Sequence, residues 1–193
     1  MSRGTGNVMK GAASGLVAGL VASWVMNQFQ ETLSLVMEGR EKPHGAQSLQ
    51  EGLPDHGAGA MLQERGVDDG SDDAAERTAN FISVEVFERK LSKDEKNVGG
   101  AIAHYLFGAT TGALYGAGAE LFPGVGVGAG LPFGAVVWVV ADEIVTPGLG
   151  LSKAASSYSF SKHAYAFSSH LVYGLTTDLV LTFLRGKRKN TRH

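Results

Sequence analysis

The sequence predicts an all-α membrane protein with four transmembrane helices and an extramembrane amphipathic helix between the first and the second of them. Apolar residues gather in four runs, each near the ~20 residues that a helix needs to cross the hydrocarbon core of a bilayer. A polar, acidic segment, residues 38–97, separates the first run from the other three. Basic residues concentrate at the two ends of the chain. This segregation of apolar and charged sequence is typical of membrane proteins.

The composition excludes several kinds of site. The 193 residues include no cysteine, which rules out disulfides, thiolate metal ligands and cysteine nucleophiles. The net charge of −2 provides no basic field that would indicate nucleic acid as a partner. The sequence contains no nucleophile motif, phosphate-binding loop or cofactor fingerprint. We therefore expect neither an enzyme nor a cofactor.

The first apolar run, Gly11–Met26, reads "GAASGLVAGLVASWVM" and follows a basic start. A basic start before an apolar core is also typical of a secretory signal peptide. No clean A-x-A cleavage site follows, however, and amphipathic sequence continues to Met37. Both features favour an uncleaved membrane helix.

The other apolar runs are Val98–Leu121, about Gly124 to Val145, and about His163 to Leu184. A soluble domain with buried glycine-rich helices is the alternative, but four such runs and a basic tail fit an amphipathic soluble pattern poorly. The third run begins "GVGVGAGLPFG", which predicts an irregular start. Membrane proteins tolerate irregular backbone only where protein or water covers it.

The positive-inside rule orients the helices. Arg3 and Lys10 lie at the N-terminus, and residues 185–193, "RGKRKNTRH", form a basic tail. Four helices place both ends of the chain on the same side, which we expect to be the cytoplasm. Residues 1–193 then form a single membrane domain, with an outward-facing acidic insertion at 38–97 and a cytoplasmic tail at 185–193.

The insertion has two predicted parts, a loop over residues 38–71 and an amphipathic helix over residues 72–96. Asp72 and Asp73 suit the N-terminal dipole of that helix. Its apolar stripe consists of Ala74, Thr78, Phe81, Ile82, Phe87 and Leu91. The loop contains two histidines in an internal echo, "PHGA" at His44 and "DHGA" at His56. We interpret them as solvated loop residues, with metal binding as the alternative.

Glycines recur at four-residue spacing in two of the runs. Lipid gives apolar helices no hydrophobic reason to associate, so small residues that allow close backbone approach favour contact. We expect the two rows to bring helices one and two together; a homodimer interface is the alternative. The rows are Gly11, Gly15 and Gly19 in the first run and Gly108, Gly112 and Gly116 in the second.

Polar residues from every expected membrane helix fall in the outer half of the bilayer. Ionisable groups at membrane depth are rare and usually face a bundle interior or a watery cavity. These residues therefore form a candidate polar or ion-binding cluster. Its members are Asn27, Gln28, His104, Asp142, Glu143, His170 and Tyr173.

Asp142 and Glu143 are adjacent, so an α-helix turns them ~100° apart and only one faces the bundle. We expect Asp142 to be the buried acid, bonded to His104, His170 or Tyr173. The cluster has three interpretations: a polar cap that holds the helices in register, a proton or cation site, or a metal or haem site that uses the histidines. No H-x-x-x-H or E-x-x-H pair occurs in a membrane run, so the spacing of these residues does not decide whether the cluster binds a metal.

Four stretches resemble the YagU-like family of bacterial inner-membrane proteins, a family without an established biochemical function. They are "GLVAGLVASWVMNQF", "AHYLFGATTGALYG", "GAGLPFGAVVWVVADEIVTPGLGLS" and "HAYAFSSHLVYGLTTDLV". The resemblance implies a multi-pass protein of the bacterial inner membrane. It implies no catalytic or binding residues.

The sequence therefore predicts a non-enzymatic integral inner-membrane protein whose outer-leaflet polar cluster binds or relays protons or cations. One alternative is a structural or accessory subunit that docks partners through its glycine-rich helix faces. Another is a metal- or haem-binding membrane protein. The expected partners are the lipid bilayer and either further copies of the chain or a larger membrane complex.

Overall fold

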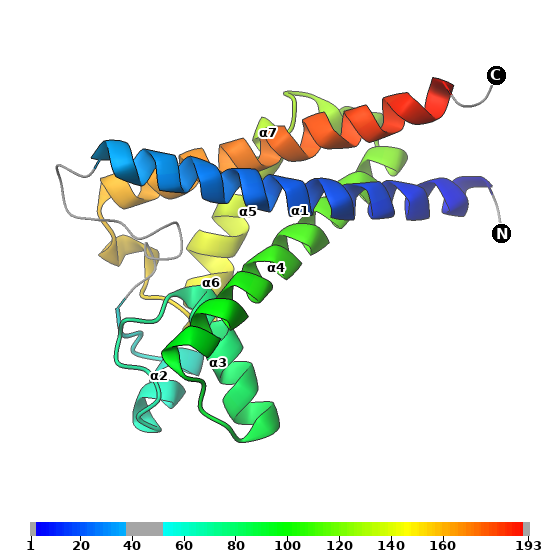
Figure 1. Ribbon diagram of the computed structural model, residues 1–193. Helices are drawn as coiled ribbons and strands as arrows, with labels where there is room; N and C mark the ends of the chain where they lie inside the picture. Colours follow the sequence, from blue (N-terminus) through cyan, green and yellow to red (C-terminus); the bar gives the residue numbers. More distant parts are fainter. Residues whose placement is uncertain (1–2, 38–51, 191–193) are drawn as a thin grey trace. The chain divides into compact units, whose positions relative to one another are not determined.

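Helices make up the regular secondary structure of the part of the chain that the computed structural model describes, residues 3–37 and 52–190 (Figure 1). The three long helices are α1 (Arg3–Met37), α4 (Lys93–Leu121) and α7 (Phe160–Asn190). Two shorter helices, α2 (Gly57–Glu64) and α3 (Ala74–Phe87), come between α1 and α4 in the chain. The predicted all-α fold is confirmed for these residues.

The chain divides into two compact units. The first contains the described residues of Met1–Phe29, Tyr105–Val137 and Phe167–His193. The second contains those of Gln30–His104 and Trp138–Ala166. The helices α1, α4 and α7 each contribute residues to both units.

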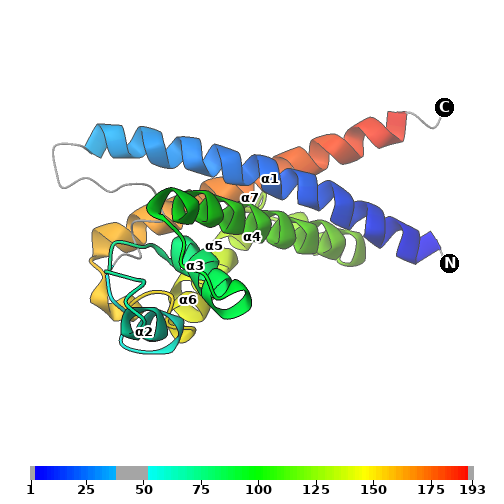
Figure 2. The same cartoon turned by 60° about the horizontal axis from the view of Figure 1, so that its bottom comes forward.

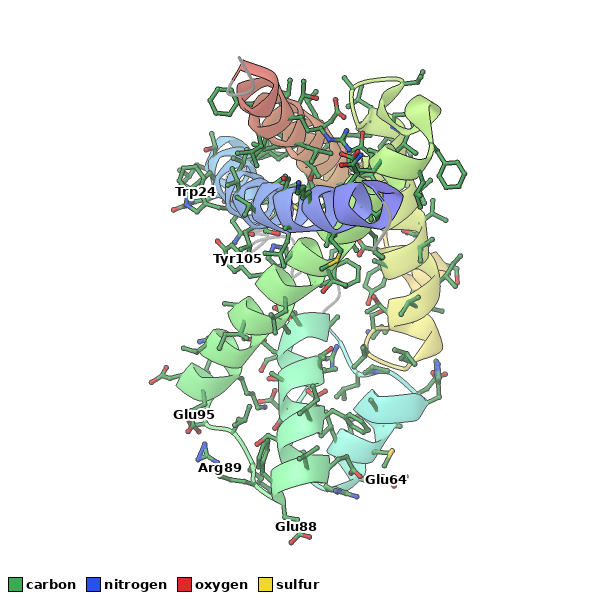
Figure 3. All side chains as sticks on the ribbon, turned by 90° about the vertical axis from the view of Figure 1, so that its right-hand side faces the viewer. Trp24, Glu64, Glu88, Arg89, Glu95 and Tyr105 are labelled. Atoms are coloured by element: carbon green, nitrogen blue, oxygen red, sulfur yellow. The ribbon has the colours of Figure 1, made fainter. Side chains whose placement is uncertain are left out.

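In the first unit, α1 passes beside α4 (Figures 1 and 2). A small apolar core forms around Ala18, Tyr115 and Leu181, with Phe133 packed against it. The rings of Tyr115 and Phe133 stack with their centroids 4.4 Å apart. Trp24, by contrast, is 56% exposed and points away from the neighbouring helices (Figure 3).

In the second unit, α2 and α3 pack together (Figure 2) around the buried side chains Leu62, Val67 and Val84. The N-terminus of α3 has a capping box. The Asp73 carboxylate accepts the backbone N–H groups of Ala75 and Glu76, and the Glu76 carboxylate accepts the N–H of Asp73.

The predicted amphipathic helix over 72–96 is wrong in one respect, because two helices occupy it. The first, α3, ends at Phe87, where Glu88 takes a left-handed conformation with φ 50°. The second, α4, begins at Lys93, and the Glu95 carboxylate accepts the backbone N–H and the hydroxyl of Ser92. The "SKDE" sequence at 92–95 is a capping-box pattern that marks this second start. Glu88 lies at the tip of the turn, and Arg89 pairs with Glu95 across it (Figure 3).

The predicted loop over 38–71 also differs from the structure, because residues 57–64 form α2. Its helical backbone begins directly after Gly57, whose φ of +62° lets the chain turn into it. Residues 38–51, which include His44, lie outside the described residues.

The third apolar run has the predicted irregular start. A 3₁₀ helix, η2 (Pro123–Gly126), precedes three residues with positive φ, Gly128, Ala129 and Gly130. The regular helix α5 (Leu131–Trp138) begins only after them.

Two helical stretches are long and apolar enough to cross a membrane, Asn7–Leu35 and Leu131–Gly148. Only 33% and 22% of their most apolar windows are buried, whereas the core helix of a soluble protein is mostly buried. The helices α4 and α7 have sufficient length, but polar residues such as His104 and Asp178 interrupt their apolar sequence. Membrane crossing by two helices thus has support from length and composition.

Candidate functional site: the Glu143–His163 pair

The helix that begins as α5 changes its winding before it ends. It continues through a π-helix, η3 (Val139–Val145), into the single turn α6 (Thr146–Gly148). Pro147 has no N–H group to donate to the α-helical carbonyl four residues earlier. The Thr146 backbone N–H and hydroxyl both donate to the Ala141 carbonyl, which is the five-residue reach of a π-helix. The two adjacent acids, Asp142 and Glu143, lie on this wide turn.

Glu143 forms an ion pair with His163 of α7, and both residues belong to the second unit. The Glu143 Oε1 atom lies 2.8 Å from His163 Nδ1. The other ring nitrogen, Nε2, lies 3.0 Å from the backbone carbonyl of Ala155, in the short 3₁₀ helix η4 (Ala155–Ser157). The side chains are 26% and 22% exposed for His163 and Glu143. The pair is therefore mostly shielded but within reach of solvent.

Two aromatic rings stand edge-on to the His163 ring. The centroid of Trp138 is 6.3 Å away and that of Tyr158 is 6.4 Å away. The Lys162 ammonium lies over the Tyr158 ring, 5.8 Å from its centroid. The imidazole that meets the two oxygens therefore lies among aromatic rings.

The protonation of the two groups decides which hydrogen bonds the ring can form. An ionised carboxylate and a backbone carbonyl can only accept hydrogen bonds. A neutral imidazole has one N–H group, and an imidazolium has two. Only protonated His163 can therefore donate to both Glu143 and Ala155.

Two predicted polar residues of the first unit, Asn27 and Tyr173, bond to partners outside the predicted cluster. Asn27 Nδ2 donates to the Tyr105 hydroxyl at 3.4 Å. The Tyr173 hydroxyl donates to the Gly108 carbonyl at 2.7 Å and lies 2.8 Å from Thr111 Oγ1.

The remaining predicted cluster members differ in burial. His170 is buried on α7. Asp142 and His104, in the second unit, are partly buried, and Gln28 is exposed. The expectation that Asp142 bonds to His104, His170 or Tyr173 stays a prediction.

The two predicted glycine rows meet in the first unit. A Cβ atom added at Gly15 would overlap the Gly112 carbonyl oxygen. Added Cβ atoms at Gly11 and Gly19 would overlap the carbonyl oxygens of Gly116 and Gly108 in the same way. The backbones of α1 and α4 are thus as close as glycine alone permits.

Sequence reasoning missed two features. The first is the role of His163, which lies 20 residues from its acid and in no recognisable metal or catalytic spacing. The second is another close glycine contact in the first unit, where Gly130 and Gly134 meet Gly174 and the backbone of His170. The four-residue spacing of Gly130 and Gly134 is the signal that indicates this contact.

One group of acids among the described residues lies close enough to hold a metal ion: Asp68, Asp69 and Asp72. Two of them already have cationic partners. The Arg77 Nε atom donates to Asp68 at 2.6 Å, and Lys96 Nζ donates to Asp72 at 2.6 Å. These two cations supply the positive charge that a metal would bring, so we assign this group a structural role.

Comparison with known proteins gives one family match. The sequence model described as "Protein of unknown function (DUF1440)" matches residues 82–179. The matched part includes both members of the Glu143–His163 pair. No curated protein and no solved structure matches the chain. The expectation of a family without an established function is confirmed, while the YagU-like name stays a prediction. The chain belongs to the DUF1440 family of proteins of unknown function.

Proposed function

We propose that this chain is a non-enzymatic integral protein of the bacterial inner membrane in which the Glu143–His163 pair binds a proton. One observation supports the proposal above all others. His163 lies between a carboxylate 2.8 Å away and a backbone carbonyl 3.0 Å away, and both can only accept hydrogen bonds. Loss of the proton breaks one of the two bonds, so the pair couples proton binding to the local structure.

The membrane location is supported by apolar side chains on the surface. On α1, the exposed residues Leu16, Val17, Leu20 and Val21 come from a helix that is long enough to span a bilayer. In water such a patch favours aggregation or association, whereas in lipid it is solvated. We extend the two candidate spans to four, with both termini cytoplasmic, because α4 and α7 have sufficient length and basic residues flank the ends of the chain.

Titration of His163 tests the proton site directly. In detergent-purified protein labelled with nitrogen-15 at its histidines, the ring nitrogen shifts are followed against pH, and His163→Gln identifies its signal among the six histidines. Glu143→Gln removes the charge of the partner, so His163 should release its proton at a lower pH than in the wild type. The matched variant is Asp142→Asn, which removes the neighbouring acid and should have the smaller effect. If Asp142→Asn changed the pH of proton release from His163 more than Glu143→Gln did, Glu143 would be excluded as the acid that holds this proton.

Proton relay requires a further measurement. Proteoliposomes that contain a pH-sensitive dye should acidify faster with wild-type protein than with Glu143→Gln when a proton gradient is imposed. Equal rates for the two proteins would restrict the function to proton binding.

A structural or accessory subunit is the second candidate function, and the first unit supports it. Two of its polar contacts join different helices: the Tyr115 hydroxyl donates to Asp178 at 2.7 Å, and Arg185 pairs with Glu120 at 2.8 Å. A bundle with its polar groups paired in this way is suited to docking through its apolar faces. A His163 that does not titrate, in a protein that co-purifies with a stoichiometric membrane partner, would favour this function. Elemental analysis and an absorption spectrum test the metal or haem alternative.

A further inference from the structure

A second histidine of the second unit has the same arrangement of bonds as His163. The Nδ1 atom of His56 lies 2.8 Å from Asp55 Oδ1, and its Nε2 atom lies 2.8 Å from the Pro147 carbonyl. Both oxygens can only accept, so His56 also satisfies both bonds only as an imidazolium.

The two histidines act on the same stretch of chain. His56 donates to the carbonyl of Pro147, and His163 donates to the carbonyl of Ala155. Both carbonyls belong to segment 146–157, which connects the π-helix to the beginning of α7. One histidine bonds near each end of the segment, and neither comes from the segment itself.

We propose that His56 and His163 form a pH-sensitive histidine clasp: each protonated ring bonds a carboxylate and segment 146–157 at once, and each ring that loses its proton keeps only one of these two bonds, which weakens its hold on the segment. The part played by His163 rests on the proposed function, whereas the part played by His56 stands on its own contacts. The structural reason is that a neutral ring keeps one N–H group, so its second nitrogen presents a lone pair to an oxygen that also has only lone pairs.

A further contact of the segment does not depend on the histidines. The Arg77 guanidinium, protonated at all accessible pH values, donates to the Leu151 carbonyl at 2.9 Å. The middle of segment 146–157 therefore stays anchored when the histidines release its ends.

The charges around His56 favour its protonated form. The hydrogen bond to Asp55 is the main cause that raises the pKa of His56 above 6.5, with the Pro147 carbonyl second. The stabilisation is therefore complete below pH 6.5 and is lost as the pH rises through the higher pKa of the folded state. The same bond to His56 lowers the pKa of Asp55 below 3.8, so the carboxylate stays charged across this range. Segment 146–157 carries a cation of its own, Lys153, whose side chain lies next to Gly52.

The groups around His163 are Glu143, Lys162 and Tyr158. Burial raises the pKa of Tyr158, so the phenol stays neutral over the pH range of the histidines. Glu143 is thus the acid that the described contacts place against this ring.

Backbone amides next to the clasp report its state. The N–H of Ala58 donates to the Leu149 carbonyl at 3.0 Å, and the N–H of Gly59 donates to the Gly150 carbonyl at 2.8 Å. The backbones approach so closely that a Cβ atom at Gly57 or Gly150 would overlap the facing chain. Release of Pro147 by His56 should loosen these bonds.

Hydrogen–deuterium exchange of the full-length protein in detergent tests the clasp. Protection factors, which correct for the intrinsic pH dependence of exchange, are measured for peptides that cover 57–60 and 148–157 at pH 5.5 and 8.5. We expect protection of both peptides to fall about threefold or more at pH 8.5, as for the loss of a net hydrogen bond. Peptides of α3 should keep their protection, since the bond from Arg77 of that helix to the Leu151 carbonyl uses neither histidine.

Variants separate the two histidines. His56→Gln should remove the pH dependence at 57–60 and leave the titration of His163 unchanged. Asp55→Asn keeps the ring and lowers the pH at which protection is lost, whereas Glu64→Gln, an exposed acid on α2, should behave as the wild type. Wild-type protection factors that do not change between pH 5.5 and 8.5 would overturn the clasp. If protection at 57–60 depended on pH through His56 while the ring nitrogen shifts of His163 did not change with pH, only the proposed proton site would be overturned.

Discussion

At the residue scale, burial gives the acids before and at the start of α3 two different roles. Asp68 is fully buried but ion-paired with Arg77, which is also fully buried. Removal of one partner of such a pair typically costs about 3–5 kcal/mol, because it leaves the other charge uncompensated. Asp73 instead caps α3 through two backbone N–H groups at 2.8 and 2.9 Å. Burial is the main cause that raises the pKa of Asp73 to about 6.

Asp73→Asn should therefore change the pH dependence of stability. The folded state binds the Asp73 proton more tightly than the unfolded state, so stability from this residue increases as the pH falls from about 6 toward 3.8. Asparagine caps helices about as well as aspartate but does not titrate. The variant should be more stable than the wild type at pH 7, by at most about 3 kcal/mol, and the difference should shrink by pH 4. Thermal unfolding at both pH values measures it.

Asp69→Asn provides the matched control for this prediction. Hydrogen bonds from Ser71 lower the pKa of the exposed Asp69, so its contribution to stability has the opposite sign. The stability that Asp69 provides is lost as the pH falls below 3.8. Identical pH profiles for Asp73→Asn and the wild type would contradict a buried, titrating cap.

At the element scale, the contact between α1 and α4 depends on the absence of side chains along one face. A Cβ atom at Gly112 would overlap the Gly15 carbonyl oxygen and approach the Cα of Gly19 to 2.7 Å. Gly118 lies on the same helix, and a Cβ atom there would meet nothing within 4 Å. The two positions therefore differ in packing but share the same helical backbone.

Alanine substitutions at these two positions should have opposite effects. Gly118→Ala should stabilise the protein by about 0.5–1 kcal/mol, because alanine favours the helix over glycine by that amount. Gly112→Ala should destabilise it by about 1–3 kcal/mol, since overpacking exceeds the helical gain. Thermal unfolding in detergent measures both. Stabilisation by both substitutions would mean that Gly112 faces lipid and that α1 and α4 do not meet there.

Local patterns in the sequence predicted the long helices and the first glycine contact, since both repeat at short, regular spacing. The π-helix was not predictable, because its apolar pattern over 139–145 is the same as that of an α-helix and its cause, Pro147, lies after it. The Glu143–His163 pair joins residues 20 positions apart, and only the fold brings them together. The break after Phe87 was missed although the capping pattern at Ser92 indicated a new helix.

At the scale of the whole molecule, the membrane proposal combines surface composition with charge at the ends of the chain. Both candidate spans, Asn7–Leu35 and Leu131–Gly148, leave most of their residues unburied by protein. If only these two cross the membrane, the loop between α4 and α5 lies on the same side as α2. If α4 and α7 cross as well, that loop lies on the side of the two termini. The position of this loop therefore distinguishes two spans from four.

The absence of cysteine allows a direct test of this difference, since a single introduced cysteine is the only thiol in the chain. Glu64→Cys, Gly124→Cys and Ser157→Cys all fall at exposed positions, and a Cβ atom at Gly124 meets nothing within 4 Å. A membrane-impermeant maleimide, applied to spheroplasts and to lysed cells, reports the side on which each thiol lies. Four spans predict that positions 64 and 157 react in spheroplasts and that position 124 reacts only after lysis. Two spans predict reaction at 64 and 124 but not at 157. Labelling of all three positions in spheroplasts would contradict both arrangements, and the cysteine-free protein measures the background.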